Sequence, residues 1–321
     1  FDNQGNMVTS SGGLVQGWNL QTTVTGTPPV PLNILIPNEV NTNGPVQTIN
    51  IPQNLVLGPK ATGDLNNTPN ITDSGIFLKG NLDSNTPING GPPGPATPPG
   101  AGYPAAGYIP DAVNSATVYD SLGNPHVIVF YWTQTANVPL VAPQWEWTAY
   151  DTGSNGQLPI PVGGPGPGPG ITDAVWVGNS GPITFNADGS LADDGSGALA
   201  YAQITLNLTN GANTPQTISV NIGTDNGASP TGIGYRDGVT GDFGGGTIDP
   251  TTNAYLPRQT VYTAYADGYS EGTLTGISVD QSGNVQCRFS NNQIISMARI
   301  AIARFANPQG LEKAGGTMFV Q

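Results

Sequence analysis

The pattern most suggestive of catalysis is at residues 268–272, which read Gly-Tyr-Ser-Glu-Gly and match the nucleophile elbow of serine hydrolases. That elbow needs a sharp turn from a strand into a helix, followed along the chain by an acid and then a histidine. Here the one histidine, His126, lies upstream, and the residues after Ser270 have the pattern of a strand. Because a serine hydroxyl without a base is not activated, we predict no catalysis at Ser270.

His126 itself could serve as a general base or a metal ligand. It follows a turn and opens an apolar run, with neither a cysteine nor an acid cluster beside it in the sequence. A zinc site needs three or four protein ligands, so we expect His126 to bond the backbone of a hairpin. Cys287, the single cysteine, is expected to pack within a strand. The sequence therefore predicts no catalytic, metal-binding or cofactor-binding residue and no cofactor.

Short turn motifs that combine Asp or Asn with Gly recur along the chain. Calcium loops are one alternative, but these need several spaced oxygen ligands and a bidentate acid, and none of the motifs supplies that set. Asp or Asn can instead bond the backbone of the turn while Gly takes a positive φ, so we predict β-hairpins. The motifs are residues 2–6, 120–124, 186–190 and 280–284.

Two tryptophans, Trp145 and Trp147, fall on one face of a segment with period-two alternation. An exposed aromatic face could bind sugars, whereas burial in a β core is the more frequent fate. A carboxylate pair for glycoside cleavage also stays open, because spacing along the chain does not set the distance between two carboxyl groups.

The composition favours strands as the elements that position these residues. Only 9% of the residues are charged, against roughly a quarter in an average soluble protein, which leaves few ion pairs for amphipathic helices. A net charge of −13 with eight Lys and Arg argues against binding to nucleic acid or to an anionic membrane. No apolar run reaches the roughly 18 residues of a membrane helix. Because the chain opens on Phe1 without a signal peptide, we expect a fragment or a processed product.

Period-two runs predict an all-β chain. The clearest predicted strands are residues 117–120, 126–133, 145–150, 203–208 and 217–222. Two Pro/Gly tracts, residues 90–100 and 163–170, are expected to form exposed loops. Residues 294–305 fit both a helical stripe and a strand face, so periodicity alone does not decide their structure.

Three groups of residues carry a more specific pattern. Near the C-terminus, residues 272–283 fit G-x-L-x-x-I-x-x-D-x-x-G, and Phe-Ser-Asn at 289–291 and Ile-Ala-Ile-Ala-Arg-Phe-Ala-Asn at 300–307 follow. The other two groups are residues 1–18 and the Val-Tyr-Asp-Ser-Leu-Gly-Asn-Pro-His run at 118–126. In this order they resemble the bacterial flagellar hook protein family, whereas residues 134–260 resemble it little.

The resemblance implies two β-rich domains, barrel-like or sandwich-like, with the second inserted into the first. It places a discontinuous inner domain at residues 1–83 plus 268–321. The inserted outer domain, with the Pro/Gly-rich loops, would be residues 84–267. The resemblance also implies that residues 294–305 are mostly strand and that Ser270 and His126 belong to hairpin motifs.

For function, the resemblance implies a structural subunit of the flagellar hook and not an enzyme. Such subunits form a curved tubular universal joint that transmits torque from the motor and rod to the filament. The implied partners are other copies of the chain, the rod and hook–filament junction proteins, and the hook cap during assembly. The implied location is the extracellular flagellum, reached through the flagellar secretion apparatus without a cleaved signal peptide.

Other readings stay open from the sequence. Rod and distal flagellar proteins share some of the terminal motifs, so a related axial protein is one alternative. Since hook proteins carry terminal helical segments that this sequence lacks, we expect the chain to be monomeric. From other classes, the alternatives are an extracellular carbohydrate-binding or adhesin β-module, of phage-tail or cell-surface type, and an extracellular glycosidase.

Overall fold

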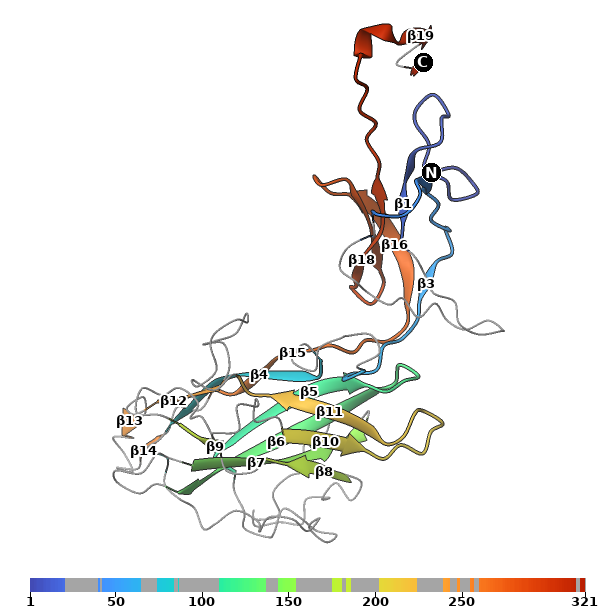
Figure 1. Cartoon of the computed structure of the whole chain (residues 1–321). Coiled ribbons are helices and arrows are strands. Elements are labelled where there is room, and N and C mark those ends of the chain that lie inside the picture. The colour runs from blue at the N-terminus through green and yellow to red at the C-terminus, as the bar shows by residue number, and fades with distance from the viewer. Residues whose placement is uncertain are drawn as a thin grey trace. The chain divides into compact units, whose positions relative to one another are not determined.

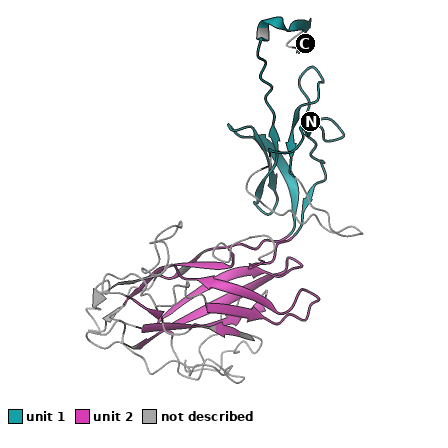
Figure 2. Cartoon of the chain, in the orientation of Figure 1, with its two compact units in different colours: residues 1–58, 271–321 teal, residues 59–270 magenta. Residues whose placement is uncertain are grey.

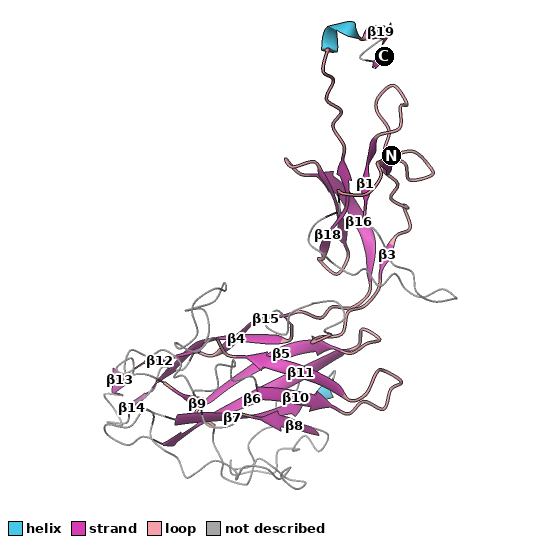
Figure 3. Cartoon of the chain, in the orientation of Figure 1, coloured by secondary structure: helices cyan, strands magenta, loops and turns pink. Residues whose placement is uncertain are grey.

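The computed structural model (Figure 1) describes a large part of the chain. The described residues are 1–20, 40, 42–64, 74–83, 86, 110–136, 144–153, 175–180, 183–185, 202–223, 239–242, 247–248, 255–256, 260–315 and 318–320. They are almost all strands and turns, with helix confined to short pieces such as η3 (Pro308–Gly310) (Figure 3). The predicted all-β class is confirmed. The predicted loops at residues 90–100 and 163–170 and the turn at 186–190 lie outside the described residues.

The chain forms two compact units (Figure 2). Unit 1 comprises residues 1–58 and 271–321, and unit 2 comprises residues 59–270. The predicted domains placed the divisions at 83/84 and 267/268, so units and predicted domains differ in the assignment of residues 59–83 and 268–270. That the units are two domains, one inserted into the other, stays a prediction.

Unit 1 is built on a six-stranded antiparallel sheet in the order β2-β1-β18-β17-β16-β3. The strands are β1 (Gln16–Asn19), β2 (Gln47–Thr48), β3 (Val56–Leu57), β16 (Gly272–Val279), β17 (Asn284–Phe289) and β18 (Ile294–Ile300). Alternate residues of β17 are buried, because successive side chains in a strand point to opposite faces. These buried residues are Val285, Cys287 and Phe289.

The ambiguous segment at 294–305 is a strand over its first seven residues, β18, which pairs with both β1 and β17. The strand implied by the family resemblance is therefore confirmed for 294–300, and residues 301–305 are in neither strand nor helix. A small hairpin of β19 (Glu312–Gly315) and β20 (Met318–Val320) follows η3.

Unit 2 contains two five-stranded sheets. The first has the order β5-β6-β7-β8, with β9 also paired to β7; the second has the order β10-β11-β4-β12, with β15 also paired to β4. The first sheet comprises β5 (Ala112–Tyr119), β6 (Pro125–Ala136), β7 (Gln144–Asp151), β8 (Val175–Asn179) and β9 (Ile183–Thr184). The second comprises β4 (Ile76–Asp83), β10 (Ala202–Leu206), β11 (Gln216–Asn221), β12 (Val239–Asp242) and β15 (Tyr262–Ala266). A separate pair is formed by β13 (Thr247–Ile248) and β14 (Tyr255–Leu256).

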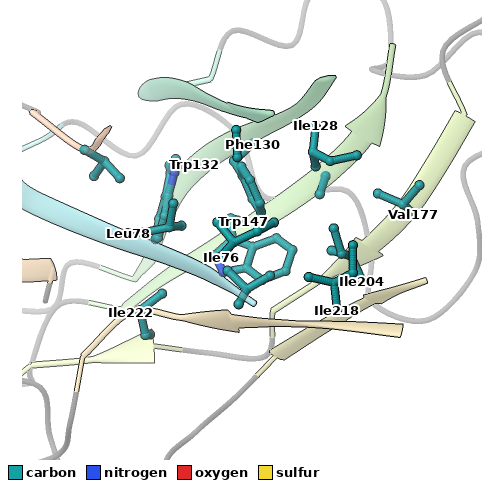
Figure 4. Packing of buried hydrophobic residues seen from close by; sticks show 14 of the residues in the cluster. Ile76, Leu78, Ile128, Phe130, Trp132, Trp147, Val177, Ile204, Ile218 and Ile222 are labelled. Atoms are coloured by element: carbon teal, nitrogen blue, oxygen red, sulfur yellow. The ribbon is translucent and has the colours of Figure 1, made fainter. Parts of the chain in front are cut away.

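The core of unit 2 lies between these two sheets, with side chains of both facing inward (Figure 4). Ile128, Phe130 and Trp132 of β6 contribute alternate residues, as do Trp145 and Trp147 of β7. The rings of Phe130 and Trp147 meet edge to face, with centroids 5.1 Å apart. Such a pair adds about 0.5–1.5 kcal/mol to the stabilisation from burial alone.

The five predicted strands of the middle region are confirmed by β5, β6, β7, β10 and β11, although residues 120, 207–208 and 222 lie just beyond the strand ends. In β7 the burial alternates from Gln144 to Ala149, with Trp145, Trp147 and Ala149 buried, and Tyr150 is buried as well. In β11 both faces are buried over the last four residues, because Ser219 and Asn221 are buried as well as Ile218 and Val220.

Candidate functional site

Three of the four turn motifs have the same hydrogen-bonded structure. In residues 2–6, 120–124 and 280–284, the Asp Oδ1 accepts from the backbone N–H groups two and four positions later. The Asp Oδ2 accepts from the Asn side chain at the fifth position. All nine distances lie between 2.8 and 2.9 Å. The carboxylate therefore reinforces a turn that backbone hydrogen bonds also close.

Glycine occupies the fourth position of each turn, with φ of 82° at Gly5, 84° at Gly123 and 80° at Gly283. This left-handed conformation disfavours residues that have a Cβ atom. The predicted hairpins are confirmed for residues 120–124, which join β5 to β6, and for 280–284, which join β16 to β17. Within the described part of the chain, no group of three or more His, Cys, Asp or Glu side chains is placed to hold a metal ion.

The turns differ in how their carboxylates are surrounded. Asp280 is at the surface, and the Asn284 side-chain hydrogen bond holds the pKa of its carboxyl below the ordinary value. Asp120 is fully buried and also accepts from Asn210 Nδ2, in the β10–β11 turn, at 2.7 Å. Burial raises the pKa of Asp120, but the hydrogen bonds from Asn124, Asn210 and Leu122 outweigh it, and the net shift is downward.

His126 lies between two carboxylates that the fold brings together. Its Nδ1 is 3.0 Å from Oδ2 of Asp151, the last residue of β7, and its Nε2 is 3.7 Å from Oδ2 of Asp120. The Asp151 hydrogen bond raises the pKa of His126; burial opposes this rise, and the charges of both carboxylates add to it. The expectation that His126 bonds the hairpin backbone is wrong. Its side chain bonds Asp151 of β7, which is 25 residues away in the sequence and is brought close by the pairing of β6 with β7.

A second buried ion pair lies where the chain enters and leaves unit 2. Lys60 Nζ donates to Asp267 Oδ2 at 2.9 Å, and both side chains are less than a tenth exposed. Asp267 also accepts from the backbone N–H groups of Gly63 and Gly75 and from Ser74 Oγ. The sequence reasoning missed this pair; the partners are 207 residues apart, so only the fold brings them together.

The serine motif does not form a nucleophile elbow. Tyr269 pairs with Lys60 in an isolated β-bridge, and the strand β16 begins two residues after Ser270, so strand and not helix follows the motif. The histidine that a triad would need is bonded to Asp151. Cys287 is fully buried in unit 1, and burial raises the pKa of its thiol to about 11, which keeps it protonated at neutral pH.

The two tryptophans proposed as a sugar-binding face are core residues. Trp145 is 0% exposed and Trp147 is 1% exposed. Stacking on a sugar requires an accessible ring, so these residues do not support the carbohydrate-binding alternative. Among the helices in the described ranges, none is long and apolar enough to cross a membrane.

The polar clusters described above join turns, strand ends and chain crossings to one another. Together with the sheets of the two compact units, they define an all-β protein. Residues 110–269 match the family described as "Flagellar basal body protein FlaE D2 domain". The chain belongs to the flagellar hook protein family.

Relatives of this family come from several bacteria. The chain is 30% identical to the flagellar hook protein FlgE of Helicobacter pylori over 64% of its own length and 23% of the relative's. It is 30% identical to the Treponema pallidum FlgE over 64% of its length and 41% of the relative's. For the Escherichia coli FlgE the identity is 25%, covering 74% of this chain and 44% of the relative. The chain thus spans less than half the length of these relatives.

A solved structure shows the same fold. The crystal structure of Helicobacter pylori flagellar hook protein FlgE2 matches with a TM-score of 0.50 and 15% identity, covering 99% of this chain and 82% of that one. At that identity the likeness supports the fold alone.

Proposed function

We propose that this chain is part of a structural subunit of the bacterial flagellar hook. In this role many copies assemble into a curved tube that works as a universal joint and transmits torque from the motor and rod to the filament. The observation that carries the proposal is the D2 family match over residues 110–269, joined by relatives that are all flagellar hook proteins.

The physical character of the chain supports this role. A universal joint bends while it resists twist, so its subunits need rigid bodies whose contacts shift without breaking a dry apolar interface. The two β units supply rigid bodies, and the sequence carries few charges of either sign. The partners we propose are other copies of the chain, the rod and junction proteins, and the hook cap. The proposed location is the extracellular hook, after export without a cleaved signal peptide.

We further propose that the protein is not an enzyme. The serine motif precedes a strand, the histidine bonds an aspartate, and the cysteine is buried as a thiol. Each of these residues therefore has a structural task in the described fold.

The test uses the complete gene in its own bacterium. Deletion is expected to give cells without hooks that do not swim, and the intact gene supplied in trans restores both. Antibodies raised against residues 59–270 are expected to label the hook in electron micrographs of isolated hook–basal bodies. Labelling of the rod or the filament junction alone would assign the chain to a related axial protein, and wild-type swimming of the deletion strain would contradict the proposal.

A further inference from the structure

The histidine of unit 2 is placed so that neither of its neutral forms fits its surroundings. Nδ1 faces Oδ2 of Asp151 at 3.0 Å, and the buried Nε2 faces Oδ2 of Asp120 at 3.7 Å. A neutral imidazole carries a proton on one nitrogen and a lone pair on the other. Either tautomer therefore points a lone pair at a carboxylate, and only the imidazolium cation offers an N–H to both.

Burial makes this placement consequential. The side chain of Asp120 is 0% exposed, and those of His126 and Asp151 are 13% and 15% exposed. Of the described residues, these two aspartates, from the β5–β6 turn and from the end of β7, are the charged groups that act on His126, while the β10–β11 turn contributes the neutral Asn210. Two carboxylates in a site with little water need a cation, because an unpaired buried charge is costly.

The same cluster joins three elements of unit 2. His126 contacts Asp151 of β7, Asp120 accepts from Asn210 of the β10–β11 turn, and the backbone N–H of Asn213 in that turn donates to Ser121 Oγ. The β10–β11 turn belongs to the second sheet and the other groups belong to the first. The cluster therefore ties the two sheets together at one end of the core.

We propose that His126 is held as the imidazolium cation and works as a pH-dependent clamp, which ties the β5–β6 turn to the end of β7 and, through Asp120 and Asn210, to the β10–β11 turn. The proposal does not depend on the function proposed above. The direction of the effect follows from the preference of the folded state for the cation. Stabilisation is complete below the unfolded-state pKa of about 6.5 and is lost as pH rises through the higher folded-state pKa.

Unit 1 contains a natural neutral counterpart of this clamp. Six residues after Asp280, as His126 is six residues after Asp120, stands Gln286, whose Nε2 lies 3.4 Å from Asp280 Oδ2. Glutamine offers an N–H at this place and does not titrate. His126→Gln is therefore the matched variant, and the Asp280 turn is an internal control in the same molecule.

The first measurement is a titration of the histidine by NMR, in protein labelled with ¹⁵N-histidine and free of any histidine tag. Because the chain has one histidine, both imidazole ¹⁵N signals belong to His126. We expect both nitrogens to be protonated at neutral pH, with a transition above 6.5 that moves toward lower pH in Asp151→Asn. A neutral tautomer at pH 7, or a transition at or below 6.5, would overturn the proposal.

The second measurement is hydrogen exchange followed by mass spectrometry between pH 6 and pH 9, with protection corrected for the intrinsic exchange rate. We expect protection of residues 119–124 and 207–216 to fall as His126 loses its proton, while that of residues 280–284 stays constant. In His126→Gln the fall should be absent. If protection fell equally in residues 119–124 and 280–284, or fell unchanged in His126→Gln, His126 would not be the clamp. Should the variant fail to fold, the NMR titration of the native protein still decides.

Discussion

At the scale of single residues, the molecule uses one turn chemistry in two environments. Asp120 and Asp280 make the same three carboxylate hydrogen bonds to their own turns. Only Asp120 is buried and bonded to a turn of another sheet, through Asn210. The same turn motif thus contributes differently to stability at the two places, because an unmet hydrogen bond costs more where water cannot replace it.

This contrast predicts that Asp120→Ala is much more damaging than Asp280→Ala. The first change removes the turn bonds and the Asn210 bond and takes one of the two carboxylates away from His126, which keeps Asp151. It should lower the unfolding free energy of unit 2 by roughly 3 kcal/mol or more. The second change removes only bonds that water can replace. Urea unfolding followed by tryptophan fluorescence and circular dichroism measures both, and equal losses would contradict the contribution assigned to burial.

The turn glycines offer a second matched pair, Gly123→Ala and Gly283→Ala. Both positions have φ near +80°, so an added Cβ should cost about 1–2 kcal/mol at each. At Gly123 the Cβ would also lie 2.7 Å from Cβ of Pro59, whereas at Gly283 the nearest atom is 3.9 Å away. We expect the larger loss at Gly123, measured by the same unfolding experiment; a larger loss at Gly283 would show that the packing against Pro59 gives way freely.

At the scale of elements, the segment that enters unit 2 around Lys60 and the segment that leaves it around Asp267 are bonded to each other. Lys60 and Tyr269 pair through their backbones, and Asp267 accepts from Lys60 and from two backbone N–H groups of the incoming segment. Thr62 bonds the backbone of Tyr119 at the end of β5, so the entering segment is bonded to the first sheet as well. These contacts predict that the segments around residues 60 and 267 unfold together with the core.

Replacing the two members of the ion pair should have unequal effects. Lys60→Met leaves Asp267 with its backbone and Ser74 donors, and we expect a loss of about 3–5 kcal/mol, the usual range for breaking a buried pair. Asp267→Ala should cost more, because it leaves the Lys60 ammonium and the N–H groups of Gly63 and Gly75 without their acceptor. Calorimetry of both variants and the double variant measures the coupling, and a smaller loss in Asp267→Ala would refute the ranking.

At the scale of the whole molecule, the net charge influences whether copies of the chain associate. The net charge of −13 makes copies repel one another at low ionic strength. The matched part of this chain covers between 23% and 44% of the length of these relatives. A proposal that follows is that assembly into a tube draws on segments of the relatives beyond the matched part.

We therefore expect residues 1–321 alone to be monomeric. Sedimentation equilibrium across a range of protein concentrations, at about 0.15 M salt where the Debye length is about 8 Å, should fit the 32.9 kDa mass of a single chain. The same run at low salt serves as the control for charge repulsion. A stable oligomer at micromolar concentration would contradict the expectation and locate assembly contacts within these two units.

Much of this architecture can be read from local pattern. The period-two runs that became β6 and β7, and the Asp-Gly-Asn turns at 120–124 and 280–284, depend on neighbours in the sequence, which is why they were predictable. The same alternation placed Trp145 and Trp147 on one face of a strand, and the fold showed that this face is buried. The strand pattern after Ser270 likewise argues against a nucleophile elbow from the local sequence alone.

What only the tertiary structure decided are the pairings between residues far apart in the chain. Asp151 of β7 bonds His126 of the neighbouring strand β6, and Asn210 of the second sheet bonds Asp120 of the first. Asp267, where the chain leaves unit 2, bonds Lys60, where it enters. Local pattern is silent on these, since side-chain partners across a fold depend on strand register and sheet packing. The sequence thus determined strands, turns and family, while strand pairing in the first sheet placed a lone histidine between two carboxylates and the second sheet added Asn210.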